Sequence, residues 1–90
     1  PGARRESMEL YIKRLEQLEA IAREQPSVTE AFAVQAGREI RVIVDARKAD
    51  DATTHMIATA IAKRVEDEMT FPGEIKVSVL REVRAEAVAR

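Results

Sequence analysis

The fold of this chain is decided between Val28 and Asp45, where the sequence reads VTEAFAVQAGREIRVIVD. On both sides of Ala36 and Gly37, apolar residues alternate with polar or small ones. This period of two is typical of strands that bury one face. A glycine at position 37 suits the positive φ of a tight turn. The stretch therefore predicts a β-hairpin.

One side of each hairpin strand is expected to face the core. The residues on that side are Val28, Phe32 and Val34 in the first strand and Ile40, Val42 and Val44 in the second, with Glu30 interrupting the first set. The opposite side then carries Thr29, Ala31, Ala33, Arg41 and Ile43.

Outward from the hairpin the apolar period becomes helical. From about Glu6 to Glu24, apolar residues recur at steps of three and four, and Pro26 ends that pattern. The same period returns from Ala52 to Met69, preceded by Asp50 and Asp51 as N-cap candidates. The sequence therefore predicts a helix on each side of the hairpin.

A third strand is expected after the turn at residues 71–73, because Ile75, Val77 and Val79 alternate with polar or exposed positions. The order is then α-β-β-α-β. It predicts an α+β fold, a two-layer sandwich with a three-stranded sheet and two helices on one face. The third strand runs either parallel to the second, through a right-handed crossover, or antiparallel to it. The sequence leaves both arrangements open.

Composition excludes several classes of function. The chain has 90 residues, which fit one domain, and a net charge of -1, whereas nucleic-acid-binding domains are usually clearly basic. It has no cysteine, so disulfides and thiolate metal sites are excluded. Its three glycines, at positions 2, 37 and 73, are too far apart for a phosphate-binding loop or the Gly-x-x-Gly loop of a KH module.

The candidate catalytic and metal-binding groups are sparse. The only histidine, His55, follows Asp51 by four residues, which is too few ligands for a metal site. Asp45, Asp50 and Asp51 cluster in one loop, but without the glycine and alternate spacing of a cation site. Helix capping explains these residues, so we expect no catalytic, cofactor-binding or metal site.

The helix-free face of the sheet is the candidate interaction surface. The apolar residues expected there are Ala31, Ala33, Ile43 and Leu80. Small and apolar residues on an open sheet indicate that something covers it, and a second copy of the chain is the simplest cover. An ordinary solvent-exposed face is the alternative. A weaker RNA-contact alternative uses Arg38, Arg41 and Lys76, which Glu39 and Glu74 dilute.

Several contiguous blocks carry a resemblance to a known family. They read PGARRES at 1–7, YIKRL at 11–15, QAGREIRVIV at 35–44, FPGEIKV at 71–77 and REVRA at 81–85. In this order they closely resemble the C-terminal end of the ribonuclease Y family of bacterial endoribonucleases, which initiate mRNA decay.

The resemblance implies a parent protein with an N-terminal membrane anchor, a coiled coil, a KH domain and a metal-dependent HD domain. Residues 1–6 would be the exit from that HD domain, 7–84 a C-terminal α+β domain and 85–90 a frayed tail. The parent would lie on the cytoplasmic face of the bacterial membrane, and this fragment would be soluble.

The HD domain's chemistry rests on a His-Asp dipeptide, but His55 precedes Met56 here. No catalytic residue of the family therefore carries over, and the divalent metal is expected in the parent's HD domain. The sequence thus predicts a non-catalytic accessory domain that forms a homodimer or positions the nuclease. Contact with RNA and docking of other RNA-decay proteins remain the alternatives.

Overall fold

The computed structural model describes residues 2–90, with the side chains of Arg5 and of residues 7–90. The elements follow the order α-β-β-α-β that the sequence predicts, so the α+β fold class is confirmed. They are helix α1 (Gly2–Arg23), strand β1 (Val28–Val34), a short 3-10 turn (Gln35–Gly37), strand β2 (Glu39–Asp45), helix α2 (Asp51–Glu68) and strand β3 (Lys76–Glu82).

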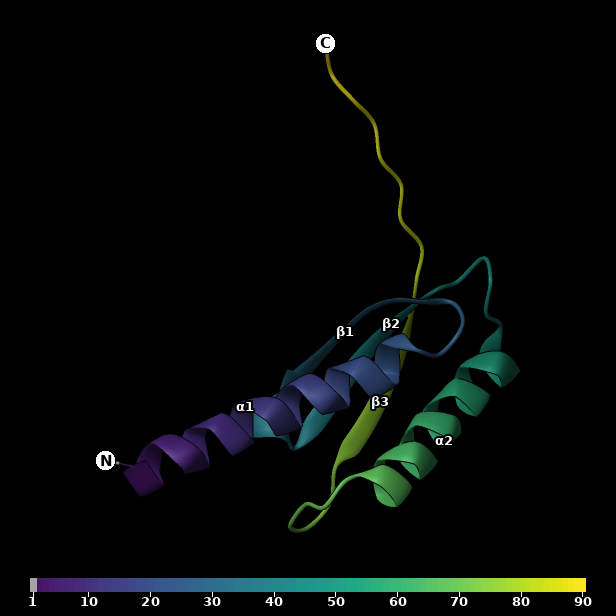
Figure 1. Cartoon of the computed structure of the whole chain (residues 1–90). Helices are drawn as coiled ribbons and strands as arrows, with labels where there is room; N and C mark the ends of the chain where they lie inside the picture. Colours follow the sequence, from purple (N-terminus) through teal and green to yellow (C-terminus); the bar gives the residue numbers. More distant parts are fainter. Residues whose placement is uncertain (1) are drawn as a thin grey trace.

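The three strands form one mixed sheet in the order β1-β2-β3. β1 is antiparallel to β2, as a hairpin requires, and β3 is parallel to β2, which decides between the two arrangements left open by the sequence. α1 packs mainly on β1 and α2 mainly on β3, so the two helices lie along the sheet as a second layer (Figure 1).

The core lies between this helical layer and the sheet. Its largest fully buried side chains are Leu18, Ile40, Ile61, Val42 and Val44. Only the C-terminal half of α1 contributes to it, whereas Met8, Leu10 and Ile12 are exposed where the helix extends beyond the sheet (Figure 1). Removal of these buried apolar side chains from water is the main stabilising contribution to the fold.

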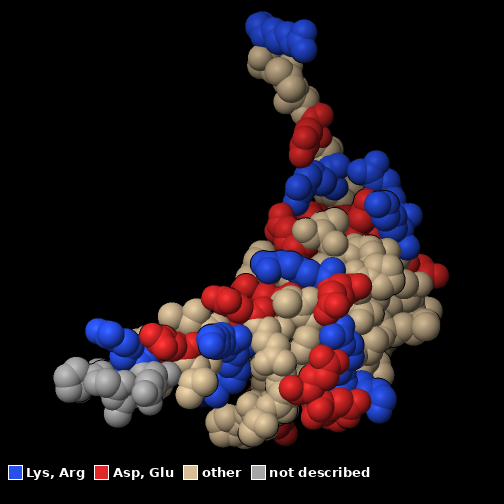
Figure 2. Space-filling view, in the orientation of Figure 1, with Lys and Arg blue, Asp and Glu red and all other residues tan. Residues whose placement is uncertain are grey.

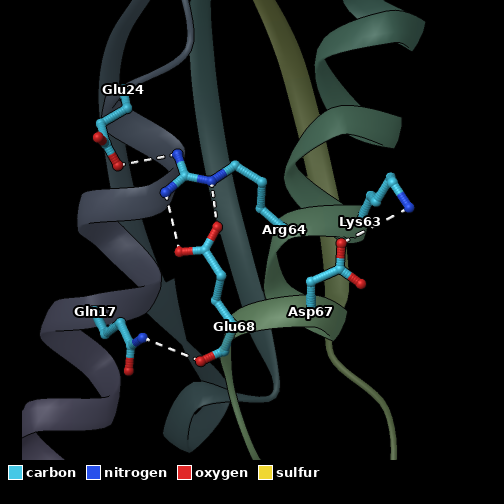
Figure 3. A network of polar contacts seen from close by, with 6 residues as sticks. All are labelled: Gln17, Glu24, Lys63, Arg64, Asp67 and Glu68. Carbon is cyan, nitrogen blue, oxygen red and sulfur yellow. Dashed lines mark hydrogen bonds and ion pairs between the residues drawn. The ribbon is translucent and has the colours of Figure 1, made fainter.

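A polar network joins the two helices above the core (Figure 3). The Arg64 guanidinium on α2 donates to Glu24 Oε2 on α1 at 3.0 Å and to both carboxylate oxygens of Glu68 at 2.7 and 3.1 Å. Gln17 on α1 donates to the Glu68 carbonyl oxygen at 3.4 Å. Hydrogen bonds from Arg64 lower the pKa of the Glu68 carboxyl. These contacts fix the position of α1 relative to α2.

The first helix is longer than predicted. It begins at Gly2, four residues before the expected start at Glu6, and Pro1 lies outside the described residues. The sequence between them, Ala3 to Arg5, consists of strong helix formers, whereas the prediction gave more weight to the turn tendency of Pro-Gly. Glycine costs little at a helix end because it is not in the interior.

The predicted core side of β1 is wrong for most of its length. The pairing of β1 with β2 shifts between Val28 and Glu30, so one extra residue, Thr29, enters β1 as a bulge. Val28 packs against the core as expected, but the alternation after the bulge is inverted. Ala31 is buried in the core, and Phe32 lies on the opposite side.

The turn between β1 and β2 confirms the expected positive φ. Ala36 and Gly37 have φ of 58° and 82°, and Gln35 joins them with 52°. Gly37 also lies close to α1, because a Cβ at this position would be 2.6 Å from Leu15 Cδ2. After β3, residues 83–90 form no helix or strand, and they extend away from the domain (Figure 1).

Candidate interaction surface

The helix-free face of the sheet consists of three cross-strand rows. Residues that pair across β1, β2 and β3 share a face, and the bulge decides which residues of β1 join them. The rows are Glu30–Ile43–Leu80, Phe32–Arg41–Ser78 and Val34–Glu39–Lys76. We call these nine residues the open face.

The structure brings together two of the four residues predicted for this surface. Ile43 in β2 pairs with Leu80 in β3, and the Leu80 side chain is 45% exposed. Ala31 and Ala33 do not belong to this surface. Ala31 is 1% exposed and Ala33 packs against the core, because the bulge turns both towards the helices.

Phe32 and Val34 take the places that the two alanines were predicted to occupy. Phe32 is 40% exposed, which is unusual for a large aromatic side chain in so small a domain. Glu30 was the available signal. It has the same parity as Phe32, and a glutamate seldom faces a core, so the alternation around it indicates that both residues point outward.

Glu39 is the buried polar side chain of the open face, with 5% of its surface exposed. Its carboxylate accepts hydrogen bonds from Gln35 Nε2 at 3.3 Å and from Arg41 Nη2 at 3.4 Å. A hydrogen bond from Ser78 is the largest cause that lowers the pKa of Glu39, and the charges of Arg41 and Lys76 act in the same direction. The carboxylate therefore joins the turn after β1 to β2 and β3.

The lowered pKa of Glu39 predicts a loss of stability in acid. Because the folded state holds the pKa below the ordinary 4.5, the contribution is complete above that value and is lost as the pH falls through the folded pKa. We expect the free energy of unfolding to fall less for Glu39→Gln than for the parent chain between about pH 6 and about pH 3. Urea denaturation at both pH values measures this, and equal losses in the two chains would contradict the assignment.

The basic residues of the RNA-contact alternative are only partly brought together. Arg41 and Lys76 lie on the open face, on either side of Glu39, which reduces their joint positive charge. Arg38 lies in the turn at the end of the sheet, where its Nε donates to the Gln35 carbonyl oxygen at 3.3 Å. Over the helical layer seen in Figure 2, acidic and basic side chains are interspersed.

The acidic loop before α2 has structural partners. Asp50 is the N-cap of α2, because its Oδ1 accepts from the Thr53 N–H at 2.8 Å. The Asp45 Oδ1 accepts from the Arg47 N–H at 2.8 Å. Asp51 bonds to Arg81 Nη1 at 2.8 Å, while His55 is exposed on α2.

Two further features are absent from the described part of the chain. Residues 2–90 contain no group of three or more His, Cys, Asp and Glu side chains arranged to hold a metal ion. Neither of the described helices combines the length and the apolar composition that crossing a bilayer requires.

Comparison with known proteins gives consistent relatives. Over all 90 residues, the chain is 54% identical to ribonuclease Y of Parafrankia sp., of which it covers 17%. It is 56% identical to ribonuclease Y of Deinococcus radiodurans and 57% identical to that of Thermus thermophilus, and it covers 16% of each. The chain thus spans about one sixth of the length of these curated relatives. No family model and no solved structure matches it.

Proposed function

Because the chain corresponds over its whole length to a domain of ribonuclease Y, we propose that it is a non-catalytic accessory domain that associates with a second copy of itself. Such association would hold two nuclease chains together and position them. The endoribonuclease activity and its divalent metal would then belong to the larger part of the protein outside these 90 residues.

The observation that carries the proposal is the uncovered sheet. The helices cover one face, and the open face presents Phe32 and Leu80 at 40% and 45% exposure beside the half-buried Ile43. A sheet with apolar side chains on an uncovered face gains free energy when a partner removes them from water. A second copy supplies a surface of the same kind, as most homo-oligomers do.

Self-association is tested by sedimentation equilibrium of the chain over a roughly hundredfold range of concentration. We expect a reversible dimer of about 20 kDa, twice the 10.1 kDa of the chain. A strict monomer over that range would contradict the proposal, and the open face would then fit a different protein, such as another RNA-decay factor.

Charges placed on the open face are expected to weaken the dimer. The double variant Ile43→Glu/Leu80→Glu puts two carboxylates in one cross-strand row of each copy, so we expect the dissociation constant to rise by roughly tenfold or more. The matched control, Met8→Glu/Ile12→Glu, adds the same charge at exposed positions of α1 beyond the sheet. Circular dichroism confirms that each variant is folded. Equal dimerisation of the two variants would contradict a role for the open face.

One observation favours contact with RNA as a second candidate function. Phe32 is exposed and pairs with Arg41 across the strands, which places an aromatic ring beside a guanidinium on the same face as Lys76. Binding of a single-stranded RNA that weakens steeply with salt would support this function. No binding at low salt would remove it.

A further inference from the structure

The two edges of the sheet are not equivalent, and the difference begins with β1. Its outward-facing backbone groups bond to side chains of α1. The Ala33 N–H donates to Glu19 Oε2 at 2.9 Å, and Arg23 Nη2 donates to the Ala31 carbonyl oxygen at 3.0 Å. These two side chains occupy the positions that a further strand would need, so the β1 edge is blocked.

β3 has an edge without such partners. Lys76 N–H donates to the Arg38 carbonyl oxygen at 2.9 Å, and the Glu82 carbonyl oxygen accepts from Ala46 N–H at 3.0 Å, so the even-numbered residues of β3 bond to β2. The backbone groups of Val77, Val79 and Arg81 therefore point away from the sheet. Within residues 2–90, no hydrogen bond reaches these backbone groups.

Helix α2 leaves this edge accessible. The grooves between α2 and β3 are lined on the helix by Thr54, Ala58 and Ala62, which are small, and on the strand by Val77 and Val79. No large side chain of α2 therefore covers the edge in the way that Glu19 and Arg23 cover β1. A seven-residue strand with an open edge is a template for pairing with another strand.

We infer that β3 pairs with β3 of a second copy, so that two sheets join into one of six strands; this inference rests on the proposed self-association. A strand that pairs with its own copy about a two-fold axis must run antiparallel to it. Full overlap of the seven-residue strand centres the axis on its middle residue, Val79. Any other centre leaves part of the edge unpaired.

The charges of β3 fit this register. With the axis at Val79, Lys76 of each copy lies opposite Glu82 of the other, and both residues point to the open face. The dimer therefore gains two oppositely charged cross-strand pairs. Val79 itself would form both central hydrogen bonds, from the N–H of each copy to the carbonyl oxygen of the other.

The first test removes these central hydrogen bonds. Val79→Pro deletes an outward N–H that no described residue uses, and proline is tolerated on edge strands. We expect the dissociation constant of the dimer to rise by roughly a hundredfold or more, with the circular dichroism of a folded chain. A folded Val79→Pro variant that dimerises like the parent chain would overturn the inference while leaving the proposed function standing. A parent chain that is monomeric throughout would overturn both.

The second test does not depend on how well the proline is accommodated. Lys76→Glu and Glu82→Lys each place two like-charged pairs in their own homodimer, so each variant alone should dimerise roughly tenfold more weakly. When the two variants are mixed, position 76 of each chain again lies opposite a charge of the other sign at position 82 of its partner, and the heterodimer should recover the parent's affinity. Because mixing changes nothing within a chain, recovery reports only the contact between copies. Mixtures no tighter than the separate variants would overturn this register.

Discussion

The Ile40→Ala variant is expected to lose about 2–5 kcal/mol of its free energy of unfolding. Ile40 lies in β2, the central strand, and its side chain is 0% exposed between the sheet and both helices. Truncating it leaves a cavity in a layer that the paired strands hold at a fixed spacing, so the surroundings collapse only partly. Because small domains have a total of about 5–15 kcal/mol, this single change approaches the limit of folding.

Urea denaturation followed by circular dichroism measures this loss. The control is Ile12→Ala on α1, which removes the same atoms from a side chain that is 45% exposed and should change stability by no more than about 0.5 kcal/mol. A loss below about 1 kcal/mol for Ile40→Ala would show that the layer over β2 is not packed as described.

The local signals of the sequence predicted most of the secondary structure. The alternation around Gly37, the N-cap at Asp50 and the stop at Pro26 each depend on residues that are neighbours in the chain. The similarity to ribonuclease Y was also found from contiguous blocks and is confirmed over the whole chain. Neither source assigns a role to the domain.

The faces of β1 were predicted less well because a bulge is a tertiary feature. One extra residue at Thr29 inverts every later position of the strand, so Ala31 and Ala33 replaced Phe32 and Val34 in the prediction. Only the pairing with β2 reveals such a shift. The outward glutamate at position 30 was the one local sign of it.

The direction of β3 and the state of the sheet edges were beyond the sequence for another reason. A connection that contains α2 is long enough to bring β3 back in either direction. Glu19 and Arg23 look like ordinary charged residues of a helix, and their role at the β1 edge depends on where α1 lies over the sheet. Long-range packing, not local pattern, decides which edge stays open.

Releasing the β1 edge is expected to convert dimers into larger assemblies. In the Glu19→Ala/Arg23→Ala variant, the Ala33 N–H and the Ala31 carbonyl oxygen lose their α1 partners and become available to another strand. With β1 and β3 both open, each chain offers two self-complementary edges, and alternating β3–β3 and β1–β1 contacts have no geometric end. We expect species well above the mass of the parent dimer in sedimentation velocity, increasing with concentration.

The matched control for this prediction is Glu9→Ala/Lys13→Ala. It also removes one acidic and one basic residue four positions apart on α1, with no change of net charge, but these exposed residues have no described hydrogen bond to β1. Its mass distribution should equal that of the parent chain. If the Glu19→Ala/Arg23→Ala variant is folded and also keeps that distribution, then α1 does not protect the β1 edge. If both variants aggregate alike, loss of α1 stability is the cause, because the two differ only in their contact with β1.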